Sequence, residues 1–194
     1  MRGATISAMQ PHERVSEAEY VARERDAEQK HQLVNGEVLA MAGGSPRHNL
    51  VSANLVATMA AKLKGRCLVF GSDQRVHVPA TSMYTYPDVT IVCGRPQFHP
   101  RFDDTLRNPT VVIEVLSEST EAYDRGAKFA HYRALESLRE YVLVSPGERH
   151  VELFARDEAG RWVLEEWLGG AAATIAAARV GLDEIYAGVE LLEG

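Results

Sequence analysis

Two stretches in the first third of the chain have apolar residues spaced as in amphipathic helices. Ser16 followed by Glu19 is a capping-box pattern, which predicts a helix over residues 17–30. A second helix is predicted to begin with Ser45 as N-cap and Pro46 in the first position, and to end at Gly65. Its apolar residues recur every three to four positions and would form one buried face: Val51, Leu55, Val56, Met59 and Leu63.

Shorter apolar runs predict β-strands. The dipeptide Asn35-Gly36 between two short segments is typical of a type I′ hairpin, because both turn positions need a positive φ. Further strands are predicted at CLVF (67–70), RVHV (75–78), PDVTIVC (87–93), TVVIEVL (110–116), REYVLVSP (139–146), HVELFAR (150–156) and RWVLEEWL (161–168), the last two as a hairpin around 157–160. A helix capped by a Ser or Thr of 117–120 is predicted after the 110–116 strand, and LDEIY (182–186) predicts one more helical turn. This order predicts an α/β fold, with a mixed sheet and helices on its faces.

The length of 194 residues fits one domain over residues 16–194, preceded by a disordered or loosely packed segment over residues 1–15. We find no apolar run of about 18 residues and no apolar core of a secretory signal, so we expect no membrane span and a cytoplasmic protein. Cys67 and Cys93 lack metal-ligand spacing. We expect both to be small buried strand residues without a disulfide, since a cytoplasm is reducing.

The net charge of −6 is unevenly distributed along the chain. Residues 148–194 contain ten acidic and four basic residues, whereas residues 41–139 contain nine acidic and twelve basic residues. The acidity therefore belongs to the C-terminal part, and the mildly basic middle is compatible with a polyanionic substrate such as DNA.

One charge lies where a strand does not favour it. Glu114 interrupts the apolar run VVIEVL, and an unpaired ionised carboxylate buried there would cost several kcal/mol. Asp88 follows Pro87, a residue that cannot donate to a sheet ladder, at the start of another predicted strand. Two acids at the ends of neighbouring strands can converge on one hard cation such as Mg²⁺, which takes one or two carboxylates with water and phosphate oxygens. Such an ion activates water for hydrolysis of a phosphodiester.

A lysine near this pair would offset the negative charge that develops during hydrolysis. The position two residues after Glu114, on the same side of the strand, holds Leu116. The next helix instead presents Asp124, Lys128 and Tyr132 at successive four-residue spacing on one face. Lys128 can therefore supply the charge from the helix.

The stretch PDVTIV…NPTVVIEVLSESTEAYDRGAKFAHYRALESLREYVLVSP resembles the Uma-two family of restriction-endonuclease-like proteins, a branch of the PD-(D/E)XK nuclease superfamily. The resemblance covers about residues 16–168, including the NGEVLAM hairpin and the SPRHNLV helix start. It implies a restriction-endonuclease-like α/β/α core with an N-terminal helix and hairpin and a C-terminal β-hairpin. It also implies that Asp88 and Glu114 bind Mg²⁺ or Mn²⁺, with Lys128 as the relocated lysine of an endonuclease that hydrolyses DNA.

The chain departs from this family at one position. Gln32 stands where the family usually carries a glutamate, and its amide brings no charge to a metal site. Glu37 could take over that role only if the hairpin folds toward the site. This departure motivates a second hypothesis, a nuclease fold that binds or assembles without cleavage, and a third is a hydrolase of small phosphoesters with the same site.

Several structural alternatives remain open from the residues alone. Asp88 could cap a turn, Glu114 could pair with Arg125 or Arg133, and Lys128 could form an ordinary helix bridge to Asp124. His48 lies at a helix start and could contact an anion, although a solvent-facing or core histidine is the more common case. The C-terminal hairpin carries aromatic residues that we expect in the core or in a homodimer interface: Phe154, Trp162 and Trp167.

Overall fold

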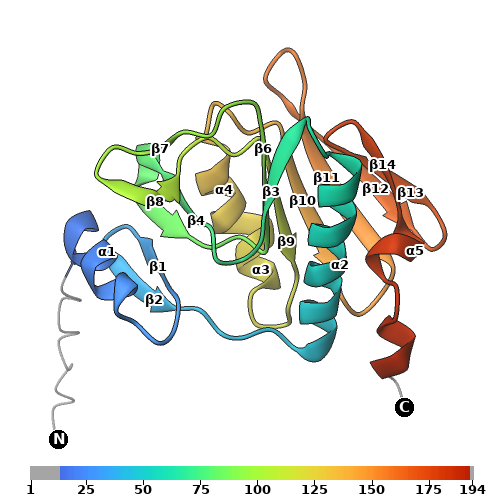
Figure 1. Cartoon of the computed structure of the whole chain (residues 1–194), viewed down its shortest axis with the longest axis horizontal. Coiled ribbons are helices and arrows are strands. Elements are labelled where there is room, and N and C mark those ends of the chain that lie inside the picture. The colour runs from blue at the N-terminus through green and yellow to red at the C-terminus, as the bar shows by residue number, and fades with distance from the viewer. Residues whose placement is uncertain (1–13, 193–194) are drawn as a thin grey trace, which may run out of the picture.

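The computed structural model describes residues 14–192, whose strands form two six-stranded sheets and a two-stranded hairpin (Figure 1). The central sheet has the order β12 (Trp162–Leu168), β11 (His150–Arg156), β10 (Glu140–Ser145), β9 (Val111–Val115), β6 (Val89–Cys93) and β3 (Cys67–Phe70). The peripheral sheet has the order β2 (Glu37–Ala40), β1 (His31–Val34), β5 (Met83–Thr85), β4 (Arg75–Val78), β8 (Phe102–Leu106) and β7 (Phe98–His99). The hairpin consists of β13 (Ala172–Ile175) and β14 (Ala178–Gly181). In the central sheet β9 and β10 are parallel and their other neighbours antiparallel, so the sheet is mixed as expected.

The helices are mostly short. They are α1 (Glu17–Arg25), α2 (Pro46–Lys62), α3 (Glu121–Tyr123), the π-helical turn η2 (Asp124–Lys128), α4 (Phe129–Tyr132) and α5 (Leu182–Ile185). Two 3₁₀ turns complete the set, η1 (Pro79–Thr81) and η3 (Val189–Leu192). None of the helices in this described part of the chain is long and apolar enough to cross a membrane.

The two faces of β9 pack against different layers, because successive strand residues point to opposite sides. Val111, Ile113 and Val115 pack in one core with the apolar face of α2. Val112 and Leu116 belong to a second core, which contains residues of α4 and of the peripheral sheet. Helices therefore cover both faces of the central sheet (Figure 1), and the predicted α/β/α core is confirmed.

The local signals for turns and helix starts are confirmed. Ser16 and Glu19 form the capping box, and the helix ends at Arg25 rather than at residue 30. Asn35 and Gly36 both have positive φ, 53° and 86°, in the hairpin between β1 and β2. For α2, Ser45 is the N-cap and Pro46 the first residue, but the helix ends at Lys62, before the predicted Gly65.

The expectation of two separate reduced cysteines is wrong. Cys67 and Cys93 form a disulfide between β3 and β6, and Cys93 is exposed. The antiparallel register places the two residues directly opposite each other, with their Cα atoms 4.2 Å apart. The distance along the chain did not reveal this pairing, because strand register depends on the packing of whole strands.

Two expectations concern the ends of the chain: a disordered N-terminal segment, and aromatic residues of the C-terminal hairpin in the core or in a dimer interface. Of the predicted disordered segment 1–15, residues 1–13 lie outside the described residues, while Val15 donates a backbone hydrogen bond to Gly36. In the C-terminal hairpin, the rings of Phe154 and Trp162 contact Phe129, so these two partly buried aromatics pack against the second core, in line with one of the two alternatives expected. The homodimer stays a prediction.

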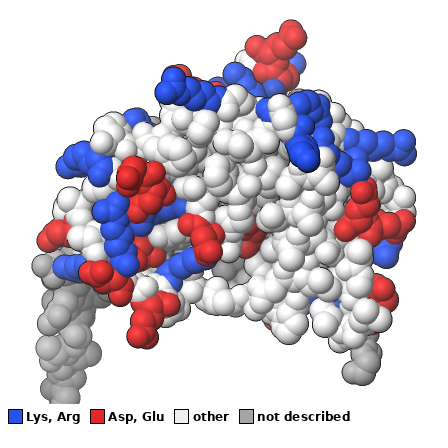
Figure 2. Space-filling view, viewed as in Figure 1, with Lys and Arg blue, Asp and Glu red and all other residues white. Residues whose placement is uncertain are grey.

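The charged residues on the face seen in Figure 2 are mixed in sign. Lysine, arginine and acidic side chains lie close together at the α1 side of the molecule, whereas the middle of this face carries few charges. No single-signed patch therefore dominates this side.

Candidate active site

A pocket of about 820 Å³ opens between the start of α2, the strands β6 and β9, and the α3–η2 segment. It brings together the three predicted site residues, Asp88, Glu114 and Lys128, from separate parts of the chain. The polar residues that line it include Gln32, His48, Tyr86, Asp88, Glu114, Tyr123, Asp124 and Lys128.

Asp88 lies immediately before β6 and contacts the neighbouring strand β9. Its Oδ2 accepts a hydrogen bond of 2.8 Å from the backbone N–H of Val115 and lies 3.2 Å from Nε2 of His48. The carboxylate thus joins two other elements instead of capping its own turn. Both of these contacts fall on Oδ2, and Oδ1 takes part in neither of them.

Glu114 is buried, on the face of β9 that is turned toward η2 and α4. Its Oε1 lies 2.9 Å from the Lys128 ammonium and accepts a hydrogen bond of 3.0 Å from the Tyr132 hydroxyl. Burial raises the pKa of Glu114 to about 8, although the charge of Lys128 acts to lower it. Both contacts fall on Oε1, so Glu114, like Asp88, has a second oxygen that they do not use.

The expected alternative partners of Glu114 lie elsewhere. Arg125 pairs with Glu121 and Glu152, and Arg133 lies over the ring of Phe129. The alternative in which Glu114 pairs with an arginine is therefore wrong.

Lys128 bridges two carboxylates inside the protein. Its Nζ lies 2.9 Å from Glu114 and 3.1 Å from Asp124, and its side chain is 7% exposed. Burial alone would lower the pKa of Lys128, but the two carboxylates outweigh it and hold the pKa above the ordinary value. The bridge to Asp124 and the approach to Glu114 thus occur together, and the lysine remains a cation.

The backbone that carries Lys128 is a π-helical turn, where an α-helix was predicted. This turn covers Asp124–Lys128, and the hydroxyl of Tyr141 donates to the Asp124 carbonyl at 3.0 Å. Such turns are rare and occur frequently at functional sites. Nothing in the apolar periodicity distinguishes a π-turn from an α-turn, which explains why the sequence patterns missed it.

The position that departs from the resembled family does lie in the pocket. The Gln32 Oε1 accepts a hydrogen bond of 3.3 Å from Tyr123 and one of 3.5 Å from Thr85. Glu37 lines a different pocket and does not replace it. The hairpin therefore brings an uncharged amide, and no additional acid, to this site.

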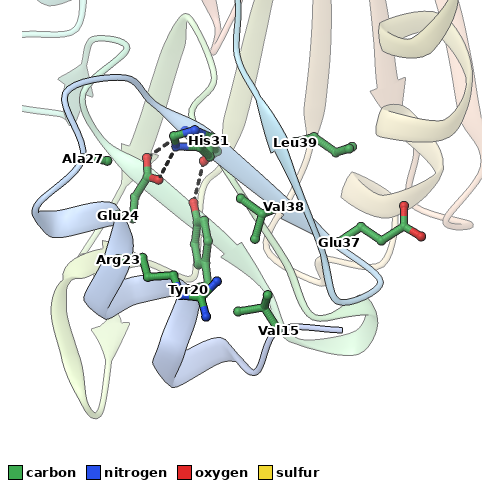
Figure 3. Close-up of a pocket in the computed structure, with 9 residues that line it drawn as sticks. All are labelled: Val15, Tyr20, Arg23, Glu24, Ala27, His31, Glu37, Val38 and Leu39. Atoms are coloured by element: carbon green, nitrogen blue, oxygen red, sulfur yellow. Dashed lines mark hydrogen bonds and ion pairs between the residues drawn. The ribbon is translucent and has the colours of Figure 1, made fainter. Parts of the chain in front are cut away.

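That second pocket, of about 520 Å³, lies between α1 and the β1–β2 hairpin (Figure 3). Its polar groups satisfy one another: Glu24 accepts hydrogen bonds of 2.8 and 3.0 Å from the backbone and ring of His31, and Tyr20 donates to the His31 carbonyl at 2.6 Å. In Figure 3 the Glu37 carboxylate points away from this group. We find no convergent free polar groups there and do not assign it chemistry.

His48 is the site residue whose role the sequence patterns missed. The chain places it in the first turn of α2, where its Nε2 approaches Asp88. The hydrogen bond with Asp88 raises the pKa of His48, against the opposing effect of burial. One signal could have indicated this role of His48. The residue lies three positions after the N-cap Ser45, on a helix that packs against the strand of Glu114.

The donor set of the pocket suits a hard divalent cation with few protein ligands. Asp88 and Glu114 each offer a carboxylate oxygen, and Mg²⁺ is commonly bound by one or two carboxylates with waters and substrate phosphates. Within residues 14–192, the group of three metal-ligand side chains whose donor atoms all lie within 4.8 Å of one another is elsewhere, on β11 and β12: His150, Glu152 and Glu166. The pocket therefore fits a site with two acidic ligands rather than three.

Comparisons with known proteins agree with this fold. A family model, Uma2, described as "Putative restriction endonuclease", matches residues 17–182. Two Synechocystis proteins named as uncharacterized are similar: sll1609 is 33% identical over 78% of this chain and 86% of its own length, and slr1290 is 35% identical over 79% and 80%. The crystal structure of a putative nuclease of DUF820 from Anabaena variabilis superposes with a TM-score of 0.72 at 14% identity, covering 89% of this chain and 97% of that one.

Proposed function

The chain belongs to the Uma2 family, and from this premise we propose that it is a metal-dependent endonuclease that hydrolyses DNA phosphodiester bonds in the pocket beside α2. One observation carries the proposal. Two acids brought together by β9 and the residue before β6, Glu114 and Asp88, line one pocket; the contacts that we find among residues 14–192 use one oxygen of each, and a buried cationic Lys128 contacts Glu114. A structural ion pair would need neither the second carboxylate nor the pocket.

Asp88 and Glu114 would hold Mg²⁺ or Mn²⁺, with the Val115 carbonyl as a further oxygen donor. When bound, such an ion supplies Lewis-acid stabilisation of a phosphate and a more acidic water. Lys128 keeps its proton and orients the attacking water or offsets charge on the phosphate, since its ammonium is fixed by Glu114 and Asp124. Tyr132 donates to Glu114 and holds that carboxylate in place.

The surface charge supports binding through the site rather than through a broad basic surface. The face in Figure 2 has mixed charges, and the net charge is −6. The pocket of about 820 Å³ lies within the size range of small-molecule sites and can take a nucleotide unit of a DNA strand. We therefore expect weak DNA binding without divalent metal.

A second candidate function is a nuclease fold that binds DNA without cleaving it. The presence of Gln32 in the pocket favours this candidate. The amide, hydrogen-bonded to Tyr123 and Thr85, contributes no charge where a third acid would strengthen metal binding. The variant Gln32→Glu discriminates the candidates: if wild type is inactive and this variant cleaves DNA in Mn²⁺, the binding module is the native function.

The direct test incubates the purified chain with single- and double-stranded DNA in Mg²⁺, Mn²⁺ or EDTA. We expect cleavage only with metal, and none with Asp88→Asn or Lys128→Met. Glu166→Gln on the distant β12 strand is the matched control and should cleave like wild type. Equal cleavage by wild type, Asp88→Asn and Lys128→Met would remove the proposal, because it would identify a contaminating nuclease or another site.

A further inference from the structure

We propose that His48 is a positioning residue of the metal site, which holds the Asp88 carboxylate in its ligand orientation and which depends on Gly44 for space. The inference rests on the proposed metal-dependent function, and it concerns the binding of the metal rather than the cleavage step.

The contact of His48 with Asp88 completes a two-sided clamp on one oxygen. Nε2 of His48 lies 3.2 Å from Oδ2 of Asp88, and the backbone N–H of Val115 donates to the same oxygen at 2.8 Å. One donor comes from α2 and the other from β9, so the carboxylate is fixed from two independent elements. A carboxylate held through Oδ2 presents its other oxygen, Oδ1, for metal binding.

The backbone of α2 fixes the ring in turn. The His48 N–H donates to the Ser45 side chain at 3.2 Å as part of the N-cap, and the His48 side chain is 15% exposed. The cap therefore fixes the backbone of His48, and neighbouring residues cover most of its ring. Groups that orient ligands in this way commonly change metal affinity when they are removed.

Gly44 lies directly against the imidazole. A Cβ at this position would come within 2.3 Å of Nδ1 of His48, which is closer than such atoms approach in proteins. Any other residue there would displace the ring from its place beside Asp88. A Cβ at the adjacent Gly43 would meet no atom within 4 Å, so Gly43 provides a matched control.

The test measures Mn²⁺ affinity by isothermal titration calorimetry on the full chain, with the metal alone and no DNA. We expect His48→Leu to lower the affinity about tenfold or more, as loss of an orienting partner does. His48→Gln keeps a side-chain N–H donor and should restore most of the affinity. Gly44→Ala should reproduce the loss, whereas Gly43→Ala should bind like wild type; circular dichroism verifies that each variant is folded.

Each outcome bears on the inference separately from the proposed function. Equal affinity in wild type, His48→Leu and Gly44→Ala would overturn it, as would equal losses in His48→Gln and His48→Leu. Should His48→Leu fail to fold, the pair Gly44→Ala and Gly43→Ala decides the matter alone. The predicted affinity pattern in a protein that never cleaves DNA would support the inference and overturn only the nuclease function, whereas absence of Mn²⁺ binding in wild type would overturn both.

Discussion

Two clusters of acidic side chains in the described part of the chain, one in the pocket and one at the edge of the central sheet, differ in their spacing and in their exposure to solvent. The pocket cluster, Asp88, Glu114, Asp124 and Lys128, lines a cavity beside the central sheet. The edge cluster, His150, Glu152 and Glu166, lies on the outer strands β11 and β12. In the edge cluster the donor atoms already lie within 4.8 Å of one another, whereas the pocket cluster is spread around its lysine.

The two clusters differ in burial mainly at one member. The side chains of Lys128 and Glu114 are 7% and 4% exposed, and Glu152 of the edge cluster is also buried, whereas Glu166 is 52% exposed. Charges in a buried pocket interact strongly and are weakly screened, whereas exposed pairs are screened by water and salt. In the edge cluster, Glu152 is also engaged by Arg125 and His150 by Glu166. We therefore base the proposed site on a cavity that holds two acids next to a fixed cation, rather than on short distances between ligand atoms.

The largest expected difference between the clusters is in DNA cleavage. Glu114→Gln should lower the rate about 1,000-fold, since loss of the ion's stabilisation costs several kcal/mol and each 1.36 kcal/mol is a factor of ten. Glu166→Gln should stay within about twofold of wild type, because removing an exposed charge disturbs the structure little. Rates of cleavage of a labelled duplex in Mn²⁺ measure both. A comparable loss in the edge variant would mean that the clusters were assigned the wrong way round.

The second largest difference is expected in the stability of variants that lose a cationic side chain, Lys128 in the pocket cluster or Arg125 beside the edge cluster. Lys128→Met leaves the buried acid groups of Glu114 and Asp124 without their cation and should lower the free energy of unfolding by about 3–5 kcal/mol. Arg125→Met removes a partly exposed partner of Glu121 and Glu152 and should cost less than about 1 kcal/mol. Urea denaturation in EDTA gives both values. The double variant Lys128→Met with Asp124→Asn should recover part of the loss; if it is additive, the lysine does not act through that carboxylate.

The pH dependence of stability should also distinguish the clusters. The folded protein retains the Glu114 proton up to a pKa of about 8, whereas the unfolded chain releases it near 4.5. Between these values the unfolded state binds fewer protons, so this contribution to stability is present below pH 4.5 and is lost as the pH rises through 8.

The measurement is the difference in unfolding free energy between wild type and Glu114→Gln, taken in EDTA from pH 4.5 to 8. We expect this difference to fall by at least about 1 kcal/mol, since one pKa unit corresponds to about 1.4 kcal/mol. Glu166→Gln should follow the wild-type slope. A flat difference for Glu114→Gln would show that its carboxyl group has an ordinary pKa in the folded protein.

The smallest effect is expected at the edge cluster itself. His150→Ala combined with Glu166→Gln removes a partly exposed pair and should change the unfolding free energy by less than about 1 kcal/mol. It should also leave the stoichiometry of Mn²⁺ binding in calorimetry unchanged. Loss of one bound Mn²⁺ in this double variant would establish the edge cluster as a metal site and narrow the difference between the two regions.

Much of the fold could be predicted because its signals are local. The capping box at Ser16, the Asn35-Gly36 turn and the start of α2 each depend on residues at most a few positions apart. The strands β5, β7 and β8 had no such signal, since β5 and β7 have only three and two residues and β8 has two exposed acids where an apolar run would be expected. They complete the peripheral sheet, so the division into two large sheets could not be anticipated.

The candidate site was predictable in its acids and less so in their partners. Glu114 was evident because a carboxylate in an apolar strand needs an explanation, and Asp88 because it begins the neighbouring strand. Tyr132 and Asp124 shared the predicted face with Lys128, although the backbone between them is π-helical. The role of His48 was missed because its partner Asp88 is 40 residues away along the chain.

The sequence by itself thus determined the order of most elements, the helix starts and the hairpin turn at Asn35-Gly36. It also revealed two acids, Asp88 and Glu114, in or next to apolar strands, where a charged side chain is unfavourable. Only the tertiary structure decided which groups meet those acids: Lys128 and Tyr132 at Glu114, and His48 at Asp88. It also decided that Cys67 faces Cys93. The reason is one of range, because caps and turns depend on neighbouring residues, whereas strand register and the packing of helices on a sheet depend on the whole core.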